Sequence, residues 1–170
     1  MTTAARAGTL SSLDRLSLFE RGLATIRHFC ETNALAVPEV RFYGELRRPP
    51  TVCAFYRPRW RSGLADNPVI FIDLPRCATI GTEGRRWSFP GYVVDRTPFG
   101  VLAHEIGHHV DWSLSDAEER TNGWRGSYSR ALSVETKDPP ITGYAPDEGE
   151  WFAEMVRLFI TNPSLLAAIR

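Results

Sequence analysis

Three of the chain's four histidines lie within six residues, in the stretch VLAHEIGHHVDW (residues 101–112). The residues before this stretch, Thr97 and Pro98, favour a helix start: the threonine hydroxyl caps free amide groups, and proline at the first helical position gives up no hydrogen bond. The histidines therefore lie on a helix that we expect to run from about Pro98 to Trp112, with apolar residues on its buried side.

His104, Glu105 and His108 form an H-E-x-x-H pattern on this helix. Residues four apart share one helix face, so both imidazoles reach one metal ion. Glu105 lies one step round the helix, where it reaches a water on that ion without binding the ion. The pattern predicts a zinc site with His104 and His108 as ligands and Glu105 as general base. On the same helix, we expect Asp111 to support a ligand histidine and His109 to have a packing or surface role.

A catalytic zinc site needs a third protein ligand and one open position for water. Glu150 and Glu154 lie one helical turn apart among apolar residues, in the segment EGEWFAEMVRLF (residues 148–159). Like charges at this spacing on a buried helix cost stability unless a cation lies nearby. We assign Glu150 as the third ligand and Glu154 as the acceptor for the outer N–H of a ligand histidine. Other carboxylates stay open as the third ligand: Asp111, Glu118, Glu119 and Asp147.

The two motifs HEIGH and EWFAE together resemble the gluzincin-like metallopeptidases of the zincin superfamily, whose second motif runs E-x-F-A-E. That group includes the catalytic domain of anthrax lethal factor and small bacterial and phage zinc peptidases. The chain departs from the metzincin branch, because Asp111 and Leu114 stand where that branch has a glycine and a third histidine.

The resemblance implies His104, His108 and Glu150 as zinc ligands and Glu105 as the catalytic residue. In several members of the family, a tyrosine shortly before the third ligand stabilises the oxyanion. Tyr144 is the candidate here, although it lies six residues before Glu150, one fewer than the family spacing. The resemblance also implies an α+β, zincin-like fold: a small, twisted, mostly antiparallel sheet packed on the active-site helix, followed by a C-terminal helical part.

The rest of the chain predicts elements that suit such a fold. Apolar residues at intervals of three and four indicate a first helix, capped by Ser12 and ending near Asn33. Segments rich in β-branched and aromatic residues predict three strands of one sheet: 40–46, 51–56 and 69–73. Two later helices are predicted to begin near Pro146 and Asn162. We expect residues 1–10 to form a flexible tail and residues 11–170 to form a single metallopeptidase domain.

Charge and cysteine content exclude several other classes of protein. Twenty basic residues balance twenty acidic ones, so we expect neither a nucleic acid nor a membrane surface as partner. Cys30, Cys53 and Cys77 include no C-x-x-C pair, which favours free and mostly buried thiols over disulfides or a zinc knuckle. We find no signal-peptide pattern and no apolar run long enough to span a bilayer, so we expect a cytoplasmic protein.

The sequence thus predicts a metallopeptidase with one zinc ion (Zn2+) per chain, acting through a zinc-activated water and Glu105. We expect a protein or peptide substrate to bind in extended form along an edge strand at residues 69–73. A first alternative is a zincin-fold regulatory or assembly protein that binds zinc and a partner with little turnover. A second is an interaction domain without metal, in which the histidine spacing is accidental.

Overall fold

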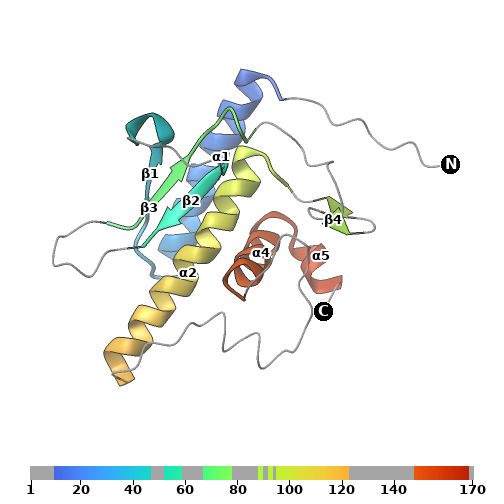
Figure 1. Cartoon of the computed structure of the whole chain (residues 1–170). Helices are drawn as coiled ribbons and strands as arrows, with labels where there is room; N and C mark the ends of the chain where they lie inside the picture. The colour runs from blue at the N-terminus through green and yellow to red at the C-terminus, as the bar shows by residue number, and fades with distance from the viewer. Residues whose placement is uncertain are drawn as a thin grey trace.

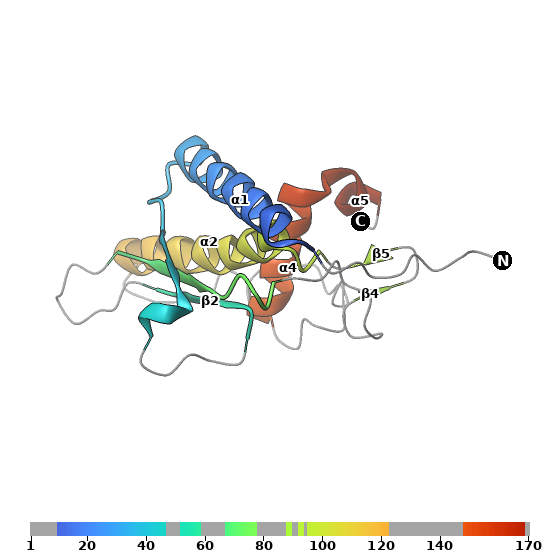
Figure 2. The same cartoon turned by 90° about the horizontal axis from the view of Figure 1, so that it is seen from above.

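The long helix α2 (Pro98–Asn122) is the element against which the others pack (Figure 1). It contacts strand β2 (Ala54–Arg57), helix α1 (Ser12–Thr32) and helix α4 (Glu148–Thr161). Figure 2 shows α1 and α2 on the same side of the sheet, with α4 crossing α2. The structure is a computed structural model that describes residues 10–46, 52–58, 67–77, 88–89, 92–93, 95–122 and 148–168.

Within these ranges the protein has an α+β fold with a three-stranded mixed sheet and four α-helices. The sheet strands are β1 (Glu39–Phe42), β2 (Ala54–Arg57) and β3 (Val69–Ile72). A short 3-10 helix (Tyr43–Glu45) follows β1. Strands β4 (Ser88–Phe89) and β5 (Tyr92–Val93) form a separate antiparallel hairpin, in addition to the three predicted strands.

The order of the sheet strands is β1-β3-β2, which corrects two expectations. The pairing of β1 with β3 is parallel and that of β2 with β3 is antiparallel, so the sheet is mixed rather than mostly antiparallel. Residues 69–73 do not form an edge strand, because β3 lies between β1 and β2. The physical reason is that all four residues of β3 are apolar and buried, as suits a strand covered on both faces.

The two faces of β3 contribute to different hydrophobic clusters. Ile70 and Ile72 pack on the face that α1 and α2 cover, together with Leu102 and Ile106 of α2. The alternate residues, Val69 and Phe71, pack with Tyr43 on the other face. This alternation follows from the two-residue period of a strand. It lets Ile70 and Ile72 pack against α2.

Helix α1 begins one residue earlier than predicted, with Ser11 rather than Ser12 as its cap. The Ser11 side chain accepts the Asp14 backbone N–H, and the Asp14 side chain accepts the Ser11 backbone N–H in return. A serine caps best when the side chain three residues later accepts the serine's backbone N–H in return. Asp14 stands at that position for Ser11. For Ser12 the position is Arg15, whose side chain has no acceptor.

Helix α2 starts as predicted but extends ten residues beyond Trp112, to Asn122. Its first turn is capped by Thr97, whose Oγ1 accepts the Gly100 N–H at 3.4 Å. The polar stretch after residue 112 contains neither glycine nor proline before Gly123, and it is rich in good helix formers. Its polarity therefore does not mark a helix end.

The C-terminal helices agree with the sequence. Helix α4 begins at Glu148 and α5 (Pro163–Ala168) follows it directly. All three cysteines are free, with Cys30 and Cys77 buried, as predicted. Among the described helices, none combines the length and the apolar character needed to cross a bilayer.

Candidate metal site

The site lies where α4 crosses α2, at a contact between two small residues. A Cβ added to Gly107 would lie 2.4 Å from the Cα and 2.9 Å from the Cβ of Ala153. Only glycine therefore lets the two helix backbones approach this closely. Gly107 belongs to the HEIGH motif and Ala153 to EWFAE, so the crossing brings the polar residues of both motifs together.

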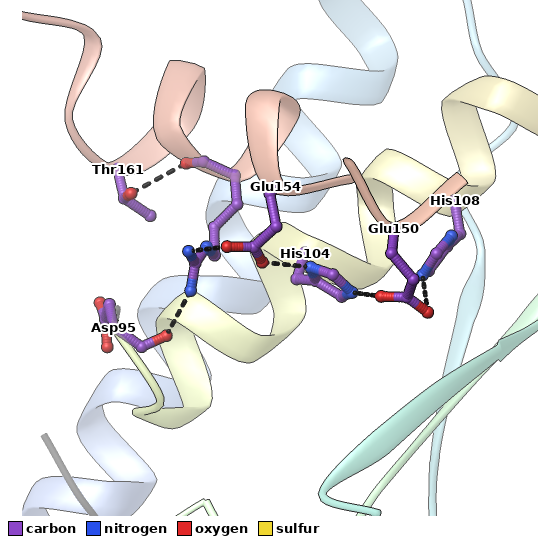
Figure 3. Close-up of polar contacts among 7 residues, drawn as sticks. Asp95, His104, His108, Glu150, Glu154 and Thr161 are labelled. Carbon is purple, nitrogen blue, oxygen red and sulfur yellow. Dashed lines mark hydrogen bonds and ion pairs between the residues drawn. The ribbon is translucent and has the colours of Figure 1, made fainter. Parts of the chain in front are cut away.

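Three side chains from the two helices converge beside this crossing: His104, His108 and Glu150 (Figure 3). One ligand atom from each lies within 4.8 Å of the others. The Nε2 atom of His104 is 3.1 Å from Oε2 of Glu150, and Nε2 of His108 is 3.6 Å from Oε1. The three residues that the sequence assigned to one metal site thus lie together in the structure, and their role as metal ligands stays a prediction.

The spacing of these atoms suits a zinc ion. Ligand atoms about 2.0–2.2 Å from a tetrahedral zinc lie roughly 3.4 Å from one another. The two nitrogen–oxygen distances, 3.1 and 3.6 Å, run to different oxygens of Glu150 and lie near that value, and the three ligand atoms as a group lie within 4.8 Å of one another. Two imidazoles and one carboxylate are also a ligand set that zinc prefers, and the set leaves a fourth tetrahedral position for water or substrate.

Glu154 lies one helical turn beyond Glu150 and binds the other nitrogen of His104. His104 Nδ1–H donates to Oε1 of Glu154 at 2.7 Å, and the Glu154 side chain is only 1% exposed. Since a carboxylate fixes the outer nitrogen, Nε2 is the atom that faces Glu150 and His108. This is the contact that we expected Glu154 to make.

The other oxygen of Glu154 accepts a hydrogen bond from Arg157, three residues further along α4. The Arg157 side chain is 2% exposed, so this is a buried ion pair. Its Nη1 also donates to the backbone carbonyl of Asp95, two residues before Thr97 caps α2. A buried polar chain thus runs from the start of α2, through Arg157 and Glu154, to His104.

Two carboxylates determine the charge of the His104 ring in the metal-free protein. Burial alone lowers the pKa of His104, but hydrogen bonds to Glu150 and Glu154 outweigh this effect and raise it to about 10. Burial raises the pKa of Glu150, and its contact with His104 more than offsets this, so that the pKa lies below its ordinary value. A metal ion that binds Nε2 of His104 must therefore displace a proton.

Glu105 lies beside this group without belonging to it, and it is 5% exposed. Burial raises its pKa to about 7, against the opposing effect of the nearby His104. The backbone N–H of Tyr56, in strand β2, donates to the Glu105 carboxylate and lowers that pKa in part. Glu105 is thus a buried carboxylate that can exchange a proton near neutral pH, which suits a general base.

His109 has a structural role, as expected from its place on a neighbouring helix face. It is buried, and its Nε2–H donates to the carbonyl of Ala36 at 2.7 Å. Its Nδ1 lies 3.1 Å from the Tyr56 hydroxyl, which donates because burial lowers the pKa of His109 and keeps the ring neutral. These two hydrogen bonds connect α2 to β2 and to the segment before β1.

The other predicted site residues are less closely defined. Tyr144 and Asp147 lie outside the described residues, as do the side chains of Glu118 and Glu119. Asp111 is half-buried on α2, one turn beyond His108, and its expected support of a ligand histidine stays a prediction. Glu150 is therefore the carboxylate that the described residues bring to the two histidines.

Sequence reasoning missed two residues that build the site, Gly107 and Arg157. A signal for Arg157 existed: it lies three residues after Glu154 and seven after Glu150, on one face of a mostly apolar helix. No comparable signal exists for Gly107, because its role depends on which residue of α4 lies opposite.

Compared with protein-family models, with curated proteins and with solved structures, the chain gives no significant match.

Proposed function

We propose that this protein is a zinc-dependent metallopeptidase of the gluzincin-like, zincin type. One observation carries the proposal: nitrogen atoms of His104 and His108 and a carboxylate oxygen of Glu150 converge within 4.8 Å of one another beside the buried acid Glu105. Two imidazoles, a carboxylate and an adjacent acid that does not bind the metal form the set that zinc-dependent hydrolysis needs.

Different residues would bind the metal ion and orient its ligands. His104, His108 and Glu150 would hold the ion, while Glu154 keeps the His104 ring in one tautomer and one orientation. When bound, zinc supplies Lewis acidity, which polarises a carbonyl oxygen and lowers the pKa of water. The outer ligands, His108 and Glu150, are partly exposed, so substrate and water reach the site from that side.

Glu105 would move the proton. Its pKa of about 7 lets it take a proton from the attacking water and return it to the departing amine near neutral pH. The Tyr56 N–H holds its carboxylate at the edge of the site, so the geometry of the base depends on strand β2. Tyr144 remains the candidate for stabilising the oxyanion, by its resemblance to the family pattern.

The substrate would lie along β2. In the described part of the sheet β2 is an edge strand, and it is the strand whose residues reach α2 through Tyr56. A peptide in extended form could add a strand at that edge and bring its scissile bond to the metal ligands.

Metal content and peptide cleavage test the proposal together. We expect the purified protein to contain about one zinc per chain and to cleave members of an unbiased peptide library. Glu105→Gln should keep the zinc and lose cleavage, since Glu105 serves the water and not the ion. Glu20→Gln, the same substitution on the exposed side of α1, is the matched control and should leave both unchanged.

The outcomes separate the alternatives. A protein that neither contains nor takes up zinc disproves the metal site. Zinc without cleavage of any library peptide favours a zinc-binding regulatory or assembly protein. Cleavage by Glu105→Gln at the rate of the unaltered protein shows that another residue is the base.

A further inference from the structure

We infer that Arg157 is a positioning residue for the metal site: its guanidinium holds Glu154 in the orientation that fixes His104. The inference rests on the proposed zinc site and extends it to a residue outside the ligand set and outside both motifs. The contacts run from the backbone of Asp95 through Arg157 and Glu154 to His104; in Figure 3, Arg157 is the arginine drawn without a label between Asp95 and Glu154.

The two oxygens of Glu154 have different partners, so the carboxylate is held at both. Oε1 accepts His104 Nδ1–H at 2.7 Å, and Oε2 accepts Arg157 Nη2–H. A carboxylate held only by the histidine could rotate and still keep one bond. With Arg157 on the second oxygen, rotation would break a charged, buried hydrogen bond, which is among the stronger kinds.

Arg157 is itself held by the chain that leads into α2. Its Nη1 donates to the Asp95 carbonyl at 3.2 Å, and the Asp95 side chain accepts the Thr97 N–H at 2.9 Å. A Cβ added to Gly100 would lie 2.3 Å from that carbonyl oxygen, so the carbonyl occupies space that only glycine leaves open. The guanidinium therefore links α4 to the segment that leads into α2.

Stability alone does not account for a charged pair at this depth. Removing two charges from water costs free energy, and apolar residues of similar volume often pack at least as stably. An apolar pair, however, supplies no acceptor for the outer N–H of His104. The pair provides an anionic oxygen in a fixed place, and orienting a ligand imidazole requires such an acceptor.

The decisive experiment compares zinc affinities in a double-mutant cycle, measured by competition with a chromogenic chelator. Arg157→Met and Glu154→Gln should each weaken zinc binding by about 10- to 100-fold. The double variant should bind no more weakly than Glu154→Gln alone, because Arg157 acts through Glu154. Arg157→Lys keeps the charge without the planar fork and should recover part of the affinity. Arg27→Met, on the exposed side of α1, is the matched control.

A second measurement needs no metal. In the metal-free protein, the Nδ1–H proton of His104 should give a downfield NMR signal, because it is bonded to a buried carboxylate. Arg157→Met should broaden or remove this signal, Arg157→Lys should keep it, and Arg27→Met should leave it unchanged. If Arg157→Met does not fold, the Arg157→Lys affinity and this signal carry the test.

The results distinguish this inference from the proposed function. Zinc affinity of a folded Arg157→Met equal to that of the unaltered protein overturns the inference and leaves the zinc site intact. Additive losses in the cycle also overturn it, because Arg157 would then act by another route. If the unaltered protein binds no zinc, the proposed function fails, and the NMR signal alone decides whether Arg157 orders His104.

Discussion

The two ends of the proposed metal site differ in how firmly they are held. At the inner end, the side chains of His104, Glu154 and Arg157 are 9%, 1% and 2% exposed, and each contacts the next. At the outer end, those of His108 and Glu150 are 21% and 27% exposed. The inner end thus excludes water and fixes geometry, while the outer end is partly exposed to solvent, where the proposed metal ion and substrate would approach.

This difference separates two requirements that a metal site must meet. A ligand needs a fixed ring or carboxylate so that the ion finds its geometry prepared, which favours burial and charged hydrogen bonds. The ion also needs an approach path and a free position, which require exposure. Glu150 and Glu154 belong to the same helix, and one turn between them carries the chain from one environment to the other.

Gly107→Ala should have the largest effect on zinc binding, because it separates the two helices that carry the residues of both ends. The new Cβ would meet backbone atoms of Ala153, which cannot move aside as a flexible side chain could. We expect a loss of about 1–3 kcal/mol in the free energy of unfolding, together with loss of zinc binding. Thermal melts and zinc titration measure the two effects.

The control for this variant is Gly44→Ala, since a Cβ at Gly44 meets nothing within 4 Å. That variant should melt and bind zinc as the unaltered protein does. If Gly107→Ala binds zinc normally, α4 has room to move away without disturbing the ligands, and the close crossing is not required by the site.

Glu150→Ala and Glu154→Ala should rank in opposite orders for affinity and for stability. Glu150→Ala removes a metal ligand and should weaken zinc binding more than the roughly 10- to 100-fold expected for Glu154→Ala. Glu154→Ala leaves the buried Arg157 without its carboxylate and should cost about 3–5 kcal/mol of stability. Glu150→Ala removes a partly exposed group and should cost the metal-free protein less.

Chelator competition and melts of the metal-free proteins give the two rankings. If Glu154→Ala loses zinc while Glu150→Ala keeps it, the roles of the two glutamates are reversed. Equal stability of the two metal-free variants would mean that the inner end is no more firmly held than the outer end.

The gap in melting temperature between zinc-bound and metal-free protein should widen as pH rises from about 6 to about 9. The folded, metal-free protein holds protons on His104, with a pKa near 10, and on Glu105, with a pKa near 7. Both pKa values exceed the ordinary ones, so the metal-free fold loses stability as pH rises through them. Zinc replaces the His104 proton, so its affinity rises by about tenfold per pH unit for each proton displaced.

Melts with saturating zinc and with chelator, at matched ionic strength, test this expectation. A gap that stays constant over the range would show that zinc displaces no proton. His104 would then not be the nitrogen ligand that the inner carboxylate prepares.

The pairing of site residues within each helix could be predicted from sequence, because the geometry of a helix is local. The spacing of His104 and His108, and of Glu150 and Glu154, places each pair on one face of its own helix whatever the rest of the chain does. The step that was not local, the meeting of the two helices, was expected from apolar surroundings and from family resemblance. The structure brings Glu150 to both histidines.

The sheet and the inner end of the site depend on long-range contacts that local sequence patterns do not determine. Residues 69–73 indicated a strand, but its central place depends on pairing with β1 and β2. Arg157 shares a helix face with Glu150 and Glu154, which is a local signal, but its contact with the carbonyl of Asp95, sixty-two positions earlier, depends on the fold. Local patterns thus predict which residues can take part in a site, while the long-range packing decides which of them are held in place.

Thr161→Val should have the smallest effect. It tests whether Arg157 positions Glu154 through its guanidinium or through its backbone. The Thr161 hydroxyl donates to the Arg157 carbonyl at 2.8 Å, one turn further along α4. Valine has nearly the same shape, so the change removes one hydrogen bond and little packing. We expect a loss of about 0.5–1 kcal/mol in the free energy of unfolding and a change in zinc affinity below about twofold. Chemical denaturation and chelator competition measure both; a loss of affinity as large as that of Arg157→Met would mean that the end of α4, rather than the buried ion pair, positions Glu154.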